Sequence, residues 1–422
     1  RFYLLQEIRM ESGFVYYEHD DVGNVTSKRV AQSGETYFEY DRLNRNTSIT
    51  YPDGKNVSFE YFKTDLLKTV ERGNAEWKYL YDANNNLYSE TLNITAESPS
   101  FPEARSYGLT YTFDAMDGLK TVTYPSNLKI DYIPNAFGRP AVVNATLNGT
   151  AADAFASAVE YHPNGQLKSV TAGNGMTIEY GQDEQQRLST LLVTGGASGS
   201  GQTLLDRTHG YDSANLLTQV SDALTASNSR VMTYDGLGRL RTASGEWGDS
   251  TISYDDVNNI LSRSVGADDF TYTYDAQNRV DTVSGAVALS YEYDVYGNAT
   301  SSGRTSFGDY TFDDASLLTM VSDADGTDRI EYDHDGNKRT VLERLVDGSS
   351  TVYKAYNLDG DLMFEEDLVS GKTKDYIYLG SSLLSTRVAD AAVAADAEDA
   401  EPDESSSESK RDQERAGGEN NE

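Results

Sequence analysis

The sequence predicts an all-β protein in which tandem antiparallel hairpins wind into a spiral β-sheet shell or a wide hollow barrel. The first observation is a Tyr-Asp step that returns about every 22 residues. The second is that aromatic residues alternate at period two before this step. The third is that Gly or Asn, and then an aliphatic residue, follow it at fixed distances. Three positions coupled in one register indicate a repeated structural unit.

Each repeat begins as a strand, because Phe270, Tyr272 and Tyr274 alternate with threonines and therefore share one face. The Asp after the last tyrosine suits a turn, where its carboxylate can accept a backbone N–H. Gly238, or Asn at the same place in other copies, supplies the positive φ that a short hairpin loop needs. The aliphatic residue two places later, such as Leu240, starts the return strand.

These repeat positions are the structural site residues that the sequence predicts. The strand-ending tyrosines are Tyr40, Tyr61, Tyr81, Tyr161, Tyr211, Tyr234, Tyr254, Tyr274, Tyr293 and Tyr332, the last with Gly336 at its turn position. The turn residues are Asp235, Asp255, Asp275 and Gly238, with Leu240 opening a return strand. An arginine often stands five residues after the tyrosine, as at Arg45, Arg239 and Arg279, and we expect it to pair with turn acids or cover aromatic faces.

The repeat divides the chain into a shell over residues 1–388, with about 17 copies, and a tail over residues 389–422. Loop excursions are expected near residues 93–106, 141–158 and 195–202; the second is Ala-rich and predicts a short helix or a widened hairpin. The tail holds 12 acids and 3 bases, which predicts disorder. Arg1 leads directly into strand-like sequence, so we expect a processed or truncated N-terminus.

The number of strands predicts the overall shape. About 34 strands at about 4.8 Å spacing form a sheet on the order of 160 Å wide, which wound once into a ring is about 50 Å across. Open sheets rarely exceed about 10 strands without coiling, and barrels of about 16–18 strands already leave a lumen. Because no helices are predicted to cover the sheet, we expect a hollow wall in which tyrosine hydroxyls reach water or a neighbouring strand.

Composition excludes several classes of protein. The 35 Lys and Arg against 68 Asp and Glu give a net charge of −33, which argues against a nucleic-acid partner. The absence of cysteine excludes disulfides and thiolate zinc. Apolar runs are only a handful of residues long, so no membrane span is predicted.

No catalytic, cofactor or metal site is predicted. The four histidines lack metalloprotease spacing, and adjacent acids such as Asp255 and Asp256 fall in predicted turns. Two loops, at residues 323–328 and 333–337, are similar to calcium loops but lack the complete EF-hand ligand order, which leaves only weak calcium binding open.

The repeat resembles the YD-repeat family, also called Rhs repeats, which occurs in bacterial Rhs toxins, the C component of Tc toxins and teneurins. Residues 234–240 (YDGLGRL) and 274–280 (YDAQNRV) carry the resemblance, which covers about residues 17–387. It implies a spiral β-shell that, in the bacterial toxins, encloses a C-terminal toxin polypeptide. The chain has no Asp-Pro dipeptide, so neither the family's DPxG-type core nor any catalytic residue is carried over.

These observations favour a non-enzymatic, secreted or cell-surface shell that encloses or presents a polypeptide cargo, or joins further YD-repeat segments. One alternative is an extracellular adhesion module whose tyrosine-rich repeats bind glycans or a partner surface. Another is a glycan-cleaving enzyme built on the wound sheet.

Overall fold

The chain is a succession of short strands with almost no other regular structure. The computed structural model describes residues 7–10, 13–30, 33–96, 102–195 and 201–391. These residues hold 36 strands and one turn of 3₁₀ helix, η2, at Ala226–Asn228.

The strands form two sheets of 26 and 10 strands, which we call the outer wall and the inner wall. The outer wall begins with β1 (Glu7–Met10), β2 (Gly13–His19), β3 (Val25–Val30), β4 (Glu35–Tyr40), β5 (Asn46–Thr50), β6 (Asn56–Tyr61), β7 (Leu67–Arg72), β8 (Ala75–Tyr81), β9 (Leu87–Ile94), β10 (Arg105–Phe113), β11 (Leu119–Thr123), β12 (Leu128–Pro134) and β13 (Pro140–Leu147). It continues with β14 (Thr150–Tyr161), β15 (Leu167–Ala172), β16 (Thr177–Gln182), β17 (Leu188–Gly195), β18 (Gln202–Tyr211), β19 (Leu217–Asp222), β20 (Arg230–Tyr234), β21 (Leu240–Gly245), β22 (Gly248–Tyr254), β23 (Ile260–Val265), β24 (Asp268–Tyr274), β25 (Val280–Gly285) and β26 (Leu289–Ser290). The inner wall holds β27 (Glu292–Tyr293), β28 (Ala299–Ser301), β29 (Asp309–Phe312), β30 (Leu318–Ser322), β31 (Asp328–His334), β32 (Thr340–Leu345), β33 (Thr351–Tyr356), β34 (Leu362–Asp367), β35 (Lys372–Leu379) and β36 (Ser382–Asp390).

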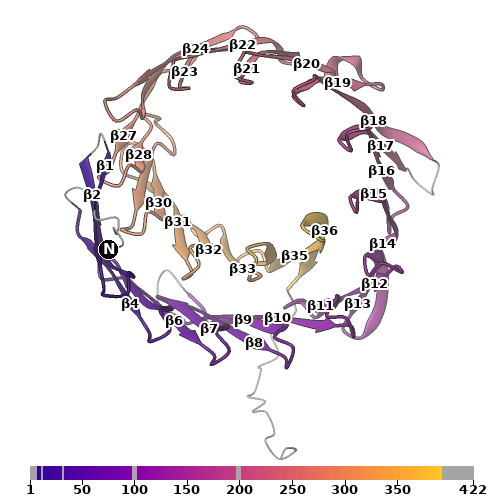
Figure 1. Ribbon diagram of the computed structural model, residues 1–422, viewed down its shortest axis with the longest axis horizontal. Coiled ribbons are helices and arrows are strands. Elements are labelled where there is room, and N and C mark those ends of the chain that lie inside the picture. Colours follow the sequence, from indigo (N-terminus) through magenta and orange to yellow (C-terminus); the bar gives the residue numbers. More distant parts are fainter. Residues whose placement is uncertain (1–6, 11–12, 31–32, 97–101, 196–200, 392–422) are drawn as a thin grey trace, which may run out of the picture.

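The strand array winds into a spiral of more than one turn (Figure 1). Within each wall every strand pairs antiparallel with the next strand along the chain. The outer wall follows a ring, and β30 to β36 run inside the arc of β4 to β13. A ring of 26 strands is about 40 Å across, wider than side chains from one wall can fill.

The buried core lies in the seam, the zone where the inner wall faces the outer wall. One cluster joins Val70, Trp77 and Leu92 of the outer wall to Leu342 and Phe364 of the inner wall. A second cluster joins Leu109, Ile130 and Val143 to Met363 and Ile377 in the same way. Each fully buried side chain of this kind contributes about 1.5–3 kcal/mol, so hydrophobic stabilisation is concentrated in the seam.

The predicted all-β class of wound hairpins is confirmed, and the structure selects the spiral over the closed barrel. Among the described strands, β1 pairs only with β2 and β36 only with β35, so neither sheet closes on itself. A closed ring would expose both faces of every strand, whereas the overlap buries one face of each wall in the seam.

The Ala-rich excursion at residues 141–158 is a hairpin and contains no helix. β13 and β14 pair across a tight turn at Asn148 and Gly149, whose φ values of 49° and 78° suit these two residues. Bulges between Ala156 and Ala158 and near Val143 absorb the extra residues. Pairing with strands on both sides satisfies the backbone, and this outweighs the helix propensity of alanine.

The other expected boundaries fall partly outside the described residues. β9 ends at Ile94 and β10 begins at Arg105; β17 ends at Gly195 and β18 begins at Gln202. Residues 97–101 and 196–200, between these strands, are not described. The last strand extends to Asp390, two residues beyond the predicted end of the shell, and residues 392–422 of the predicted tail lie outside the description.

Candidate functional site: repeat turns, inner face and seam

The Asp after each strand-ending tyrosine organises the turn. The N–H of Asp235 donates to the carbonyl of Arg239 (2.9 Å), and the N–H of Gly238 donates back to the carbonyl of Asp235 (3.0 Å). Oδ1 of Asp235 accepts the N–H groups of Leu237 and Arg239, both at 2.9 Å. Gly238 has a φ of 78°, which glycine adopts without a Cβ penalty. The N–H and the guanidinium of Arg239 lower the pKa of Asp235, so this carboxylate is charged and fully occupied by its own turn.

The arginine at the end of the turn connects one hairpin to the next. Nε of Arg239 donates to Oδ2 of Asp235 (2.7 Å), and Nη1 donates to Oδ1 of Asn258 in the following turn (2.8 Å). Its guanidinium also lies 4.5 Å from the ring centroid of Tyr254. Arg45 and Arg279 make the corresponding ion pair and ring contact. Each arginine therefore pairs with a turn acid and covers an aromatic face, as the repeat pattern predicts.

The strand-ending tyrosine connects each hairpin to the one before it. The hydroxyl of Tyr254 donates to the carbonyl of Leu240 (2.9 Å), and that of Tyr274 donates to the carbonyl of Ile260 (2.8 Å). In both cases the acceptor is the first residue of the preceding return strand. Four further tyrosines repeat this geometry, namely Tyr161 to Pro140, Tyr211 to Leu188, Tyr234 to Leu217 and Tyr293 to Val280.

Nine of the ten predicted tyrosines stand at the last position of a strand: Tyr40, Tyr61, Tyr81, Tyr161, Tyr211, Tyr234, Tyr254, Tyr274 and Tyr293. Asp255 and Asp275 build the same turn as Asp235, with Asn258 and Asn278 at φ values of 76° and 61°. Leu240 opens β21.

Tyr332 is the exception, because β31 continues two residues beyond it and the turn begins at Asp335. The residue with positive φ there is Lys338, at 65°. Arg339 lies four residues after Asp335 and bonds to it, as Arg239 bonds to Asp235. Gly336 therefore serves a different purpose from the one expected. A Cβ at this position would lie 2.3 Å from Cγ1 of Val70 in the outer wall, so close packing across the seam requires the glycine.

The aromatic face of the sheet points toward the centre of the ring. Trp77 points inward because its Nε1–H donates to Oδ2 of Asp335 in the inner wall (2.8 Å). Residues directly opposite each other in an antiparallel pair share a face, so the strand register extends this orientation around the wall. We call the part of the outer wall that the inner wall does not face the single-layer wall. Its inward positions include Ile178, Val193, Leu205, Val220, Met232, Ile252, Phe270, Tyr272, Val283 and Leu289.

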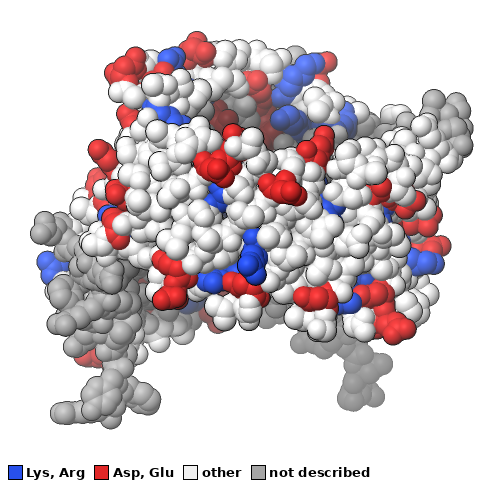
Figure 2. Space-filling model, turned by 90° about the horizontal axis from the view of Figure 1, so that it is seen from above, with Lys and Arg blue, Asp and Glu red and all other residues white. Residues whose placement is uncertain are grey.

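The outward face of the same strands carries small hydroxyl side chains. Cross-strand hydrogen bonds join Thr273 to Thr282 (2.7 Å) and Ser253 to Ser262 (2.6 Å). Figure 2 shows acidic and basic side chains scattered among uncoloured residues on the face in view, not gathered into one patch of a single sign. The wall is therefore rich in aromatic and aliphatic side chains toward the centre, and it carries small hydroxyl side chains toward the outside. The inward face also holds Arg207, His209, Arg230 and Arg263.

Polar side chains cross the seam and are buried with the core. The hydroxyl of Tyr107 donates to Oε2 of Glu366 (2.6 Å), in addition to the bond between Trp77 and Asp335. Other crossing hydrogen bonds run from Ser126 to Asp375, from Tyr124 to the carbonyl of Tyr376 and from Tyr132 to the carbonyl of Tyr378. Because unpaired buried donors and acceptors cost free energy, these pairs fix how the inner wall sits on the outer wall.

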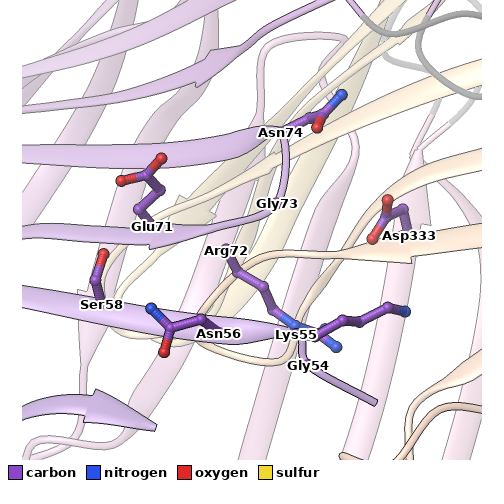
Figure 3. A pocket seen from close by; sticks show the side chains of 9 residues that line it. All are labelled: Gly54, Lys55, Asn56, Ser58, Glu71, Arg72, Gly73, Asn74 and Asp333. Atoms are coloured by element: carbon purple, nitrogen blue, oxygen red, sulfur yellow. The ribbon is translucent and has the colours of Figure 1, made fainter. Parts of the chain in front are cut away.

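One end of the seam holds a buried ion pair beside a cavity of about 490 Å³. Nη2 of Arg72 lies 2.5 Å from Oδ2 of Asp313, and both side chains are at most 5% exposed. Figure 3 shows Arg72 and Lys55 extending from the outer wall toward the strand that carries Asp333. Burial raises the pKa of Asp333 and lowers the pKa of His334. Asp313 stays charged, because the N–H of Leu317 and the guanidinium of Arg72 hold its pKa below the usual range against the effect of burial.

Glu90 is a buried carboxyl on the inward face of the outer wall, with a relative exposure of 1%. The hydroxyl of Tyr111 donates to its Oε1 (2.5 Å), while Oε2 has no hydrogen-bond partner among the described residues. Burial raises the pKa of Glu90 to about 7, although the bond from Tyr111 favours the charged form.

Within the described ranges, no group of three or more His, Asp or Glu side chains is placed to hold a metal ion. The two loops similar to calcium loops are hairpin turns whose acids already have partners. Asp323 accepts a hydrogen bond from Nε of Arg329 (2.7 Å), and Asp335 accepts one from Trp77. The described part of the chain contains no helix long and apolar enough to cross a membrane.

No family model and no curated protein sequence matches the chain, but solved structures do. The crystal structure of TcdB2-TccC3-Cdc42 matches with a TM-score of 0.55 and 16% identity, over 86% of this chain and 22% of that chain. TcdB2-TccC3 without its hypervariable C-terminal region matches with a TM-score of 0.56 and 15% identity, over the same shares. The Tc holotoxin pore of Photorhabdus luminescens matches with a TM-score of 0.53 and 17% identity, over 87% of this chain and 21% of that chain.

The chain has the fold of these Tc toxin components. At such low identity the likeness concerns the path of the backbone and assigns no role to any residue. The chain spans about one fifth of the length of each of these chains.

The seam residues are the functional side chains that the sequence analysis missed. Burial alternates along β33, with Tyr353 and Ala355 buried and Val352 and Tyr356 only partly buried, so the local pattern does not mark the seam.

Proposed function

We propose that this chain is a non-enzymatic wall of a YD-repeat shell, which encloses or presents a polypeptide cargo. The observation that carries the proposal is the inward orientation of the aromatic face in a single-layer wall. Soluble proteins rarely leave large apolar surfaces without a partner. A polypeptide held at the centre of the ring would cover this face, and the hydroxyl-rich face would remain in water.

The fold shared with TcdB2-TccC3 supports the same function, and it supports a secreted or cell-surface location. Buried carboxylates such as Asp222, Asp335 and Asp375 favour a structural role, since they accept hydrogen bonds within turns or across the seam. Further YD-repeat segments are a second class of partner, because the chain spans a small part of the matched chains.

The test is protection of a passenger polypeptide. An unstructured, protease-sensitive passenger is fused after Glu422, and its digestion by trypsin is followed in time. We expect digestion to be slower, by about ten-fold or more, than for the passenger alone. Phe270→Asp with Tyr272→Asp, on the inward face of β24, should accelerate it.

The matched control is Thr271→Asp with Thr273→Asp on the outward face of the same strand, which should leave protection unchanged. If the fused and the free passenger are digested at the same rate, the proposal is wrong. Binding to a glycan array without any protection would instead favour the recognition module.

A further inference from the structure

A groove runs along one rim of the spiral between the two walls, with a volume of about 770 Å³. Its outer side is formed by residues at four successive hairpin turns, represented by Leu87, Leu119, Arg139 and Leu167. Its inner side is formed by the turn at residues 357–361 and by the connection between β35 and β36. We call this feature the rim groove.

The length of the rim groove suits an extended peptide. Successive turns on one rim are two strands apart, or about 10 Å, so four turns span about 30 Å. An extended chain covers this length with about nine residues.

The floor of the rim groove offers aromatic rings, because the hydroxyls of its tyrosines are already bonded. Tyr132 donates to the carbonyl of Tyr378 (2.8 Å), Tyr161 to the carbonyl of Pro140 (2.9 Å) and Tyr378 to the carbonyl of Leu362 (3.0 Å). Apolar side chains also stand at both edges, where Leu119 and Leu358 are 45% and 38% exposed. A ligand therefore meets an apolar surface with few free hydrogen-bonding groups.

Charge differs between the two sides of the groove. The inner side carries Asp359, which is exposed, and Asp361, which bonds to Asn357. Glu90 lies buried at the base and adds further negative charge when it is ionised. On the outer side Arg139 covers the ring of Tyr161, 5.6 Å from its centroid. The exposed charge beside Leu358 is thus negative and complements a cationic side chain.

We propose that the rim groove binds an extended, apolar peptide segment that places a Lys or Arg side chain against Asp359. This inference rests on the proposed function in that the enclosed polypeptide is the source of the segment. Apolar side chains of the peptide pack on the aromatic floor, and its basic residue pairs with the inner side. Such a site would hold one point of the cargo at the rim.

The probe is a fluorescein-labelled nine-residue peptide in which Leu and Val alternate with Ser and Thr around a central Arg. A second peptide carries Glu at the central position, and both are titrated with the full chain by fluorescence anisotropy. We expect the Arg peptide to bind about ten-fold more tightly than the Glu peptide, since one partly desolvated ion pair contributes about 1.4 kcal/mol. Asp359→Lys should reverse that order.

Leu119→Asp should weaken both peptides about ten-fold or more by placing an unpaired charge against their apolar side chains. Leu237→Asp, at an equally apolar turn of the single-layer wall, is the control and should change neither affinity. The proposal is overturned if neither peptide binds, or if Asp359→Lys leaves the preference for Arg intact. Peptide binding without passenger protection would count against the enclosing function and in favour of the groove, so the two proposals fail separately.

Discussion

Tyrosine serves this wall because one side chain supplies both an apolar ring and a hydrogen-bond donor. The ring of Tyr274 lies on the inward face, while its hydroxyl reaches the carbonyl of Ile260 one hairpin earlier. Phenylalanine could pack in the same place but would leave that carbonyl without this donor. The turn acids are equally specific, because Asp275 accepts the N–H groups of Gln277 and Arg279, both at 2.9 Å. The excess of tyrosine and of acid in the composition therefore comes largely from the repeated turn.

Tyr274→Phe should weaken the link between β23 and β24. Loss of one hydrogen bond costs about 1 kcal/mol, so amides of these strands should exchange about five-fold faster. Hydrogen exchange read by mass spectrometry measures this. Tyr272→Phe is the control, because this tyrosine shares the strand and the face but its hydroxyl donates to none of the described residues. Equal acceleration by both substitutions would contradict the assigned role.

At the scale of the element, each hairpin is joined to the next by the same few contacts. Arg239 bonds its own turn and the following turn, and it covers Tyr254. Where asparagine replaces the arginine, the shorter side chain still reaches both turns: Nδ2 of Asn259 donates to Asp255 and to Asn278. Ladder pairing and turn contacts are therefore local, so a repeat contacts mainly its neighbours.

Arg239→Ala should lower the free energy of unfolding by about 1 kcal/mol, since it removes a partly buried ion pair and a ring contact. Arg239→Asn should recover part of that loss, because asparagine already fills the corresponding position at residue 259. Urea denaturation followed by circular dichroism compares the two. If the Asn variant is less stable than the Ala variant, the two side chains do not share one role.

At the scale of the whole molecule, the seam packs strands near the end of the chain against strands of its first half. It buries both hydrophobic clusters and the ion pair of Arg72 with Asp313. Breaking one side of a buried ion pair is costly, which makes the seam the place where single changes act most strongly. In the single-layer wall no second wall packs against the described strands, so single changes there should cost less stability.

The two tryptophans test this contrast. Trp77→Phe removes a buried indole and one of the two side-chain donors to Asp335, the other being Arg339, so we expect a loss of about 2–3 kcal/mol in urea denaturation. Trp247→Phe, at a side chain 40% exposed in the single-layer wall, should cost about 0.5 kcal/mol or less. A similar cost at both sites would argue against a seam that holds the spiral together.

Glu90 makes the seam sensitive to pH. Its pKa in the folded state is about 7, above the ordinary value of about 4.3 for the unfolded chain. The folded state therefore binds the proton more tightly, and its stability contribution is complete below about pH 4 and is lost as pH rises through 7. Glu90→Gln should thus gain stability relative to the unchanged chain between pH 5 and about pH 8. Denaturation midpoints at four pH values measure the difference, and a constant difference would contradict the raised pKa.

The sequence by itself determined the hairpin, its turn and the wound all-β class, because these depend on contacts within about 20 residues that recur in register. Tyr234 ends β20, Gly238 has a positive φ in the turn that follows Asp235, and Leu240 opens β21. The tertiary structure alone decided that the sheet overlaps itself, and with it the turn at Asp335, the packing role of Gly336 and the burial of Glu90. These features depend on pairs such as Trp77 and Asp335, which are 258 residues apart. A local periodicity cannot predict which of two residues so far apart in the sequence will meet. Their contact depends on the accumulated twist and curvature of all the strands between them.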